Sequence, residues 1–236
     1  MKKIMEGYEM KRYIFLVLWF CVVSVTALPL VVLTGCGGGG GGDSAPAPTP
    51  VPPTPPPSTE ALIGNFRFVY KILTTWTDRI TLNTKSSLKS SEGTDVFTGF
   101  NASYPSVTVA VGSWMPSISK YIIVEGMGSS SPFVSGYVFS INADNTLPGC
   151  YMISSDSGDT WSNCYAFILP NSHKTPLGSW EMTAEAQASP IDIIEAFEKR
   201  LAEDREIQAR HPESAVSVDG DLKLKINELK ALISGQ

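Results

Sequence analysis

The stretch GCYMISSDSGDTWSNCY, residues 149–165, places two strand-like segments on either side of a run that favours a tight turn. Residues 149–154 and 160–169 have the composition of short strands, whereas Asp, Ser and Gly at 156–158 favour a turn. The stretch therefore predicts an antiparallel hairpin. If the turn centres on Ser157, Cys150 lies directly opposite Cys164, and the Cα atoms of such a pair approach to about 4.5 Å, which a disulfide tolerates.

Within this stretch, SSDSGDTW at residues 154–161 resembles the Asp-box, Ser-x-Asp-x-Gly-x-Thr-Trp, best known from sialidases and related β-propellers. The resemblance implies a structural hairpin turn that lies far from catalytic groups. Its residues are Ser154, Asp156, Gly158, Thr160 and Trp161. The aspartate accepts hydrogen bonds from the turn, the glycine takes a positive φ and the tryptophan packs beneath the sheet.

The enzymatic interpretation of the same stretch is a hydrolase that uses Asp156 or Asp159. Sialidases carry several Asp-boxes together with an arginine triad. This chain has one Asp-box, and its β region holds only Arg67 and Arg79. We therefore expect a clasp here, with no catalytic residue, and a protein that is not an enzyme.

The N-terminus has the order of a secretion signal, with basic residues followed by an apolar run at 13–33. The run ends in LTGC, residues 33–36, which resembles the lipobox of bacterial lipoproteins. The resemblance implies cleavage before Cys36 and acylation of its thiol and new amino group, so that the protein binds the membrane through lipid. The length alone also permits a single membrane span, the alternative. The residue after Cys36 is Gly37, whereas the inner-membrane retention signal of enteric bacteria has aspartate there. An outer-membrane destination in the cell envelope is therefore favoured.

Loss of the signal changes what the cysteines can do. Cys21 leaves with the signal and Cys36 is acylated, which leaves Cys150 and Cys164 as the remaining thiols in an oxidising compartment. We therefore expect a disulfide between them, although a redox pair or half of a metal site is the alternative. The two histidines of the chain, His173 and His211, fall in different predicted elements. We expect no metal site and no cofactor.

Composition divides the chain into four segments: a signal peptide (1–35), a lipidated cysteine with a Gly/Pro-rich spacer (36–59), a β domain (60–180) and an acidic helical tail (181–236). Removal of residues 1–35 takes away four basic and two acidic side chains from totals of 18 and 23, which leaves a net charge of −7. This charge argues against nucleic acid as a partner.

The β domain shows short apolar and aromatic runs separated by Gly, Pro, Asn and Ser, as in all-β sandwiches and barrels. Alternation is clearest in Phe66, Phe68 and Tyr70, which we expect on one face of a strand. Eight strands are predicted, at residues 65–73, 77–84, 95–101, 107–113, 119–125, 134–142, 149–154 and 160–169. The expected fold class is mainly β, an eight-stranded antiparallel meander that closes into a small barrel, with a β-sandwich as the alternative, followed by a short α-helical C-terminal region.

The start of this domain, LIGNF at residues 62–66, resembles the opening of lipocalin-like barrels, where Gly-x-Trp begins the first strand and the aromatic ring plugs the barrel floor. Phe66 stands at the tryptophan position. The chain departs from the family pattern after the last predicted strand, because His173 and Lys174 follow there and no arginine is present to stack on the ring. The resemblance implies a small lipocalin-like barrel and no particular ligand.

The tail predicts two helices. The first begins at Ser189-Pro190, with Ser as the N-cap, and ends at His211-Pro212. Its predicted apolar face consists of Ile191, Ile194, Phe197 and Leu201. The second is predicted from Asp221, with short strands as the alternative, and its apolar face consists of Leu222, Ile226, Leu229 and Ile233.

Together these features predict a lipid-anchored envelope protein whose β-barrel is a non-enzymatic binding module for a small apolar or saccharide ligand. The alternative is a structural or interaction lipoprotein whose C-terminal helices dock a partner protein along the apolar stripe of the helix at 190–210. A hydrolase is the third and least favoured hypothesis.

Overall fold

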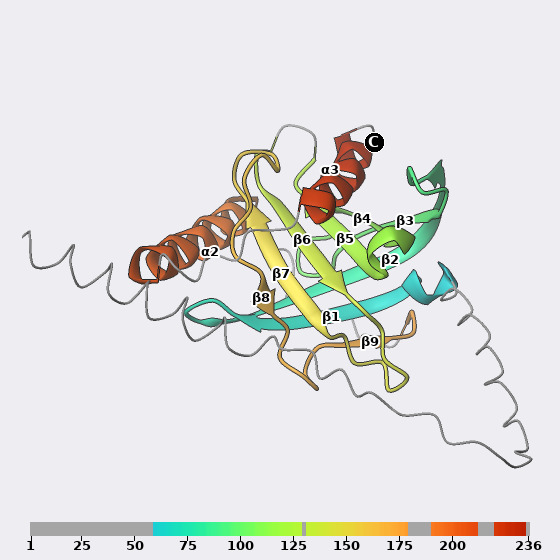
Figure 1. The fold of residues 1–236 in the computed structure, drawn as a ribbon, viewed down its shortest axis with the longest axis horizontal. Coiled ribbons are helices and arrows are strands. Elements are labelled where there is room, and N and C mark those ends of the chain that lie inside the picture. The colour runs from blue at the N-terminus through green and yellow to red at the C-terminus, as the bar shows by residue number, and fades with distance from the viewer. Residues whose placement is uncertain (1–58, 129–130, 179–189, 212–219, 235–236) are drawn as a thin grey trace, which may run out of the picture. The chain divides into compact units, whose positions relative to one another are not determined.

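The computed structural model describes residues 59–128, 131–178, 190–211 and 220–234. The predicted signal peptide, Cys36 and the spacer up to residue 58 lie outside the described residues. The described part consists of nine antiparallel strands in one sheet that curls into a half-barrel, followed by two α-helices (Figure 1). The predicted mainly β class with a helical C-terminal region is confirmed. All nine strands belong to one sheet, so the β-sandwich alternative is wrong.

Neighbours along the chain pair side by side through the meander, and the order across the sheet is β8-β7-β6-β5-β4-β3-β2-β1-β9. The strands are β1 (Gly64–Lys71), β2 (Thr75–Lys89), β3 (Asp95–Asn101), β4 (Val109–Met115), β5 (Lys120–Gly126), β6 (Val134–Phe139), β7 (Gly149–Ser154), β8 (Tyr165–Ala166) and β9 (His173–Thr175). Two short 3-10 helices, η1 (Thr59–Leu62) and η2 (Pro116–Ile118), precede β1 and β5.

The curl of the sheet follows from contacts between strands that are far apart in its order. Phe68 on β1 packs against Tyr137 and Phe139 on β6, with ring centroids 4.6 and 5.3 Å apart. Four strands separate β1 from β6 in the sheet. Rings of these strands can meet only if the sheet bends around them, so the aromatic face is the concave one.

Residues 165–175 contact both edges of the curled sheet. β8 pairs with β7, β9 pairs with β1, and Phe167 between them bridges to Tyr70. The predicted strand at 160–169 is therefore mostly wrong, since only 165–166 form a strand, and β9 was not predicted. The reason lies in a helix: the N–H of Asn163 donates to Asp204 at 3.3 Å, so this segment binds the helix instead of extending the ladder on β7.

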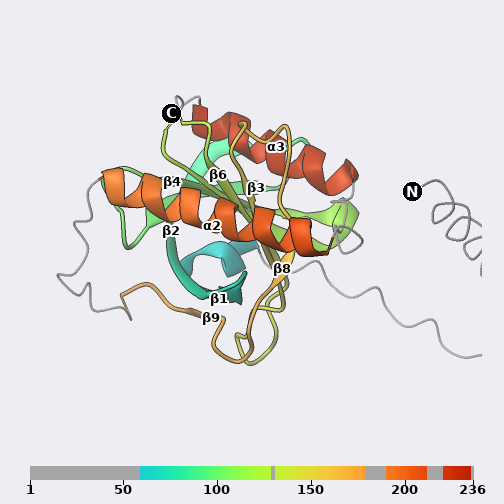
Figure 2. The ribbon, with the colours of Figure 1, turned by 90° about the vertical axis from the view of Figure 1, so that its left-hand side faces the viewer.

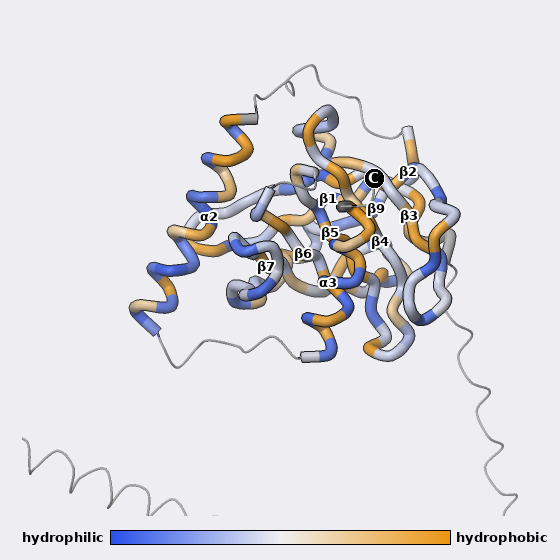
Figure 3. Tube along the Cα trace, turned by 90° about the horizontal axis from the view of Figure 1, so that it is seen from above, coloured by the Kyte–Doolittle hydropathy of each residue, from blue (hydrophilic) through white to orange (hydrophobic). Residues whose placement is uncertain are grey.

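The two C-terminal helices, α2 (Pro190–Arg210) and α3 (Gly220–Ser234), lie where two were predicted. In Figure 2, α2 crosses in front of the strands and α3 runs above them. Both alternate hydrophobic and hydrophilic turns along their length (Figure 3). Neither of these described helices combines the length and the apolar character that a membrane span requires.

α3 covers the convex face of the sheet over β4 and β5. Its buried residues are Ile226, Leu229 and Ile233, three of the four predicted apolar positions. They pack against a layer of aliphatic side chains and methionines of the sheet, and Trp161 packs against the same layer. That layer consists of Val96, Val111, Met115, Ile122, Val124, Val134, Val138 and Met152.

The buried face of α2 differs from the predicted one. Ile191 and Ile194 are 65% and 37% exposed, whereas Ile193 is buried together with Phe197 and Leu201. The predicted face included Ile191 and Ile194 in place of Ile193, because the prediction did not take the charged residues of the helix into account. Three charged residues of α2 are also buried, namely Arg200, Glu203 and Asp204. They fix which side of α2 meets the sheet.

Candidate functional site

The concave face is filled by its own side chains. Tyr70 stacks on Tyr151 with ring centroids 4.0 Å apart, and Phe68 lies 4.9 Å from Phe167. The largest fully buried side chains of the described residues are Tyr70, Tyr137, Tyr151, Phe66, Phe68, Phe97 and Phe139. This packing leaves the expectation of a ligand held inside the barrel without structural support.

An ion pair lies among these rings. Nη2 of Arg200 on α2 donates to Oδ1 of Asp78 on β2 at 2.7 Å, and both side chains are at most 7% exposed. The second oxygen of Asp78 accepts hydrogen bonds from the hydroxyls of Tyr70, at 2.6 Å, and Tyr137, at 3.0 Å. A buried carboxylate is tolerated because three donors replace the water that it loses.

A second carboxyl group, Glu125 on β5, lies on the other side of Tyr137. Its Oε1 accepts from the amide of Asn101 at 2.9 Å, and its Oε2 lies 2.8 Å from the Tyr137 hydroxyl. Burial raises the pKa of Glu125 to about 7, and the charge of Asp78 adds to the rise.

The number of hydrogens available to Tyr137 and Glu125 also favours a protonated Glu125. The Tyr137 hydroxyl has one hydrogen and lies within hydrogen-bond distance of both Asp78 and Glu125. When Glu125 is protonated it donates to the oxygen of Tyr137, and Tyr137 donates to Asp78. When Glu125 is ionised, only one of the two carboxylates can accept the hydrogen of Tyr137. The geometry therefore favours the neutral form of Glu125.

A carboxyl group that titrates near neutrality is suited to general acid–base chemistry. Glu125, however, is 1% exposed and Asp78 is 3% exposed. A substrate cannot reach either group in this conformation. We assign the cluster of Asp78, Glu125 and Arg200 a structural role in the docking of α2.

Two further carboxylates of α2 hold the rim of the concave face. Glu203 accepts hydrogen bonds from the N–H groups of Leu73 and Thr74 in the β1–β2 turn, both at 3.1 Å, and from the indole of Trp76 at 3.0 Å. Burial acts to raise the pKa of Glu203, but the hydrogen bonds from Thr74 and Trp76 outweigh it and lower this pKa. Asp204 accepts from the hydroxyl of Tyr165 at 2.5 Å.

The Asp-box stretch is a hairpin turn held by its own side chains. The carboxylate of Asp156 accepts from the N–H of Thr160 and from the hydroxyl of Ser154, both at 2.8 Å. Ser157 and Gly158 take positive φ values of 60° and 88°. Burial acts to raise the pKa of Asp156, but these bonds lower it overall. With its carboxylate engaged in this way, Asp156 gives the hydrolase hypothesis no support.

The two helices contact this hairpin and the residues that follow it. On α3, the amide of Asn227 donates to the carbonyl of Gly158 at 3.1 Å, and Lys223 and Lys230 donate to the carbonyls of Asp159 and Ser157. On α2, Asp204 accepts from the N–H of Asn163 and the hydroxyl of Tyr165, which follow the hairpin. The hairpin at 154–161 therefore contacts α3, and the residues that follow it, Asn163 and Tyr165, contact α2.

The sulfur atoms of Cys150 and Cys164 lie at bonding distance, with Cα atoms 5.5 Å apart. The predicted register was wrong, however, because Cys150 pairs with Ala166 and Tyr151 with Tyr165. The segment before β8 departs from the ladder, since the N–H of Ile153 donates to the side-chain hydroxyl of Ser162 at 3.0 Å rather than to a backbone carbonyl. The disulfide joins β7 to this irregular segment.

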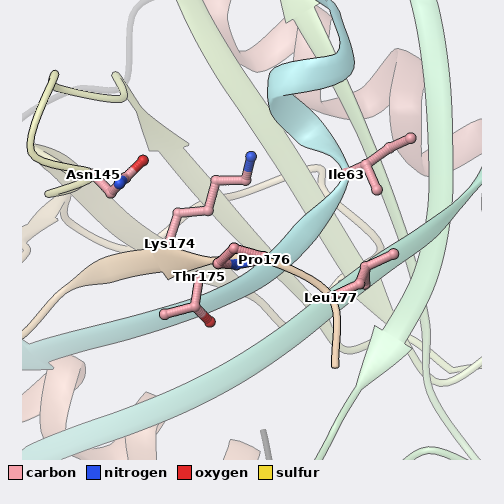
Figure 4. A pocket seen from close by; sticks show the side chains of 6 residues that line it. All are labelled: Ile63, Asn145, Lys174, Thr175, Pro176 and Leu177. Atoms are coloured by element: carbon pink, nitrogen blue, oxygen red, sulfur yellow. The ribbon is translucent and has the colours of Figure 1, made fainter. Parts of the chain in front are cut away.

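One open pocket, of about 410 Å³, lies where β9 meets the start of β1 (Figure 4). Its described lining residues are Ile63, Asn145, Lys174, Thr175, Pro176 and Leu177. The wall is held together because the N–H of Lys174 donates to the carbonyl of Asn145 at 2.9 Å. Burial lowers the pKa of Lys174.

The Lys174 ammonium also lies over the ring of Phe66, 5.9 Å from its centroid. The sequence showed no arginine to stack on this ring, and in the structure Lys174 of β9 lies over it. Phe66 itself is fully buried at the concave face.

The buried positions of Asp78, Glu125 and Arg200 were not predicted from the sequence, although the sequence contains a signal for them. Asp78 has the phase of Ile80 and Leu82 in β2, and Glu125 has the phase of Ile123 in β5, so alternation places both carboxyl groups inward. Arg200 follows Phe197 by three positions, which is the same face of a helix. Charged residues at positions where the sequence pattern places buried apolar residues therefore indicate a buried polar cluster.

No family model matches the chain, and neither the curated proteins nor the solved structures contain a match to it. Among the described residues, no three His, Cys, Asp or Glu side chains gather closely enough to hold a metal ion.

Proposed function

We propose that the chain is a lipid-anchored protein of the bacterial cell envelope whose β domain binds one small ligand without transforming it. The anchor is supported by the apolar run at 13–33 and the lipobox that ends in Cys36. The binding role is supported by the pocket between β1 and β9. Its volume of about 410 Å³ lies within the range of small-molecule sites.

The lining favours an apolar ligand with an anionic group over a saccharide. Ile63, Pro176 and Leu177 provide apolar contact, and the amine of Lys174 provides a cation that is partly removed from water. A charge interaction is stronger where water is partly excluded. No aromatic ring for sugar stacking is present among the described lining residues.

The partner-docking alternative loses its main basis in the structure. The hypothesis depended on an unpaired apolar stripe along the first helix. Phe197 and Leu201 of that stripe are buried in the concave core of the same chain, and Arg200 between them pairs with Asp78. We therefore favour ligand binding at the β9 pocket.

Binding is tested on the Cys36→Ser chain, which lacks the lipid attachment site, with decanoate as the probe in an NMR titration. Decanoate should shift the resonances of β9. Lys174→Met should weaken its binding about tenfold, equivalent to about 1.4 kcal/mol, because the carboxylate loses its cation. Lys71→Met, at the far end of β1, is the matched control and should bind as the parent does. Equal binding by both variants, or none by the parent, would contradict the proposed site.

The anchor is tested separately in cells. The unmodified chain should fractionate with membranes and carry acyl chains on Cys36, as measured by mass spectrometry of the N-terminal peptide. Cys36→Ser should carry no acyl chains and should keep residues 1–35, because cleavage takes place at the lipobox. A parent chain that is neither cleaved nor acylated would favour a single membrane span instead.

A further inference from the structure

The guanidinium of Arg200 lies in a cage of aromatic rings. Its central carbon is 4.5 Å from the ring centroid of Trp76, 5.6 Å from that of Tyr151 and 5.9 Å from that of Tyr70. Asp78 accepts its Nη2 hydrogen at 2.7 Å. Aromatic faces and a carboxylate around one position are the groups that recognise an organic cation.

The carboxylate and three of the four rings around Arg200 come from the sheet, and the fourth ring, Phe197 on α2, lies 5.8 Å from the central carbon. Tyr70 lies on β1, Trp76 and Asp78 on β2, and Tyr151 on β7. Tyr70, Asp78 and Tyr151 hold one another without help from α2, because Tyr70 stacks on Tyr151 and donates to Asp78 at 2.6 Å. The indole of Trp76, in contrast, donates to Glu203 of α2 at 3.0 Å. Tyr137 on β6 donates to the same carboxylate. The carboxylate and the tyrosine walls are therefore fixed by contacts within the sheet and preorganised for a cation.

The occupant, in contrast, comes from a separate element. Arg200 is 122 residues from Asp78 along the chain and enters the cage on α2. Its fit is incomplete: Nε is buried without a hydrogen-bond partner among the described residues, and Nη1 lies 3.4 Å from the Tyr151 hydroxyl. The cage therefore uses the end of the guanidinium group and does not depend on the rest of the side chain.

We propose that the concave face of the β domain is a binding site for guanidinium compounds, and that Arg200 is its tethered intramolecular ligand. α2 then acts as a plug. A free guanidinium-bearing ligand, such as an arginine side chain of a peptide, enters the cage when Arg200 is absent or withdrawn. This site is distinct from the β9 pocket and does not depend on the function proposed for it.

The geometry favours guanidinium over ammonium. A planar guanidinium stacks on the face of Trp76 while its N–H groups reach Asp78, whereas an ammonium is a compact and strongly hydrated charge. When Arg200 is removed, the cage should therefore bind methylguanidinium in preference to methylammonium.

The experiment uses the Cys36→Ser chain with Arg200→Ala, titrated with methylguanidinium at millimolar concentrations and followed by thermal unfolding. The midpoint should rise in a saturable manner, because a ligand that binds only the folded state stabilises it. Methylammonium at equal ionic strength should give a smaller rise. The parent chain, whose cage is occupied, should show no saturable rise. Equal responses to the two cations, or equal responses of the variant and the parent, would overturn the proposal.

A second variant covers the case in which Arg200→Ala does not fold alone. Arg200→Ala combined with Asp78→Asn removes both buried charges and leaves no carboxylate for the probe, so it should fold and show no saturable response to methylguanidinium. If this double variant folds and methylguanidinium restores folding of Arg200→Ala, the proposal is supported. If the double variant folds and methylguanidinium restores nothing, the proposal is wrong.

Discussion

α2 and α3 are both amphipathic helices of one acidic region, yet they attach to the sheet by different means. α3 lies on the convex face and buries aliphatic side chains, and no charged residue of its described part is buried. α2 meets the concave face and buries three charged residues beside its apolar ones: Arg200, Glu203 and Asp204.

The difference shows what each kind of contact can do. Apolar burial stabilises in proportion to area and tolerates small shifts in register. A buried charge is tolerated only next to a group of opposite charge, and burial anywhere else destabilises the fold. The buried contacts of α3 are therefore apolar, with hydrogen bonds to the hairpin only at the surface, whereas the position of α2 is specified by the groups that meet Arg200 and Glu203.

Removal of the Arg200 charge should have the largest effect. Arg200→Met leaves Asp78 buried without its cation, and we expect a loss of about 3–5 kcal/mol in the free energy of unfolding, measured with urea. Arg200→Met combined with Asp78→Asn should recover most of this loss, because no buried charge is then unpaired. Additive losses in the double variant would show that the two groups do not act as a pair.

The attachment of α3 is tested by truncation of a fully buried side chain. Ile226→Ala should reduce the free energy of unfolding by about 2–5 kcal/mol, since it leaves a cavity in the aliphatic layer. Leu224→Ala on the same helix is the control, because Leu224 is 67% exposed and should change stability by less than about 0.5 kcal/mol. Similar losses from both variants would contradict one-sided packing of α3.

The pH dependence of stability should come in part from Glu125 beneath α2. Its pKa is about 7 in the folded protein against 4.5 for the ordinary group, so the folded state binds this proton more tightly. The resulting stabilisation is fully present below pH 4.5 and is lost as the pH rises through about 7. Glu125→Gln keeps a donor for Tyr137 and an acceptor for Asn101, and cannot titrate.

We therefore expect the stability of the parent relative to Glu125→Gln to fall by on the order of 2 kcal/mol between about pH 5 and about pH 8. Urea unfolding at a series of pH values measures this difference. Ile226→Ala should leave the pH profile unchanged, because α3 contacts none of these groups. A constant difference between the parent and Glu125→Gln across this range would mean that Glu125 is ionised throughout.

The smallest expected effect concerns the hairpin that meets α3. Asp156→Ala removes the acceptor of hydrogen bonds from Thr160 and Ser154, and we expect a loss of about 1–2 kcal/mol in the free energy of unfolding. Hydrogen exchange should increase in α3, whose lysines donate to the carbonyls of this turn. Increased exchange in α2 and not in α3 would contradict the conclusion that the hairpin holds α3.

The strands of the β domain were predictable because side chains such as Phe66, Phe68 and Tyr70 alternate across a half-buried sheet. The eighth strand was not, because Asn163 binds Asp204 of α2, a contact between residues 41 positions apart. The face of α2 was misplaced for a related reason. Apolar periodicity favours a buried face that includes Ile191 and Ile194, whereas the observed orientation of the helix depends on the ion pair between Arg200 and Asp78.

Hydrogen exchange of α2 and α3 in Arg200→Met is the measurement that tests most directly whether α2 is held by its charges. We predict that the amides of α2 lose protection while those of α3 keep the protection that they have in the parent chain. Equal loss in both helices, or full protection of α2, would contradict the conclusion that the Arg200 cage holds α2 as a separate element.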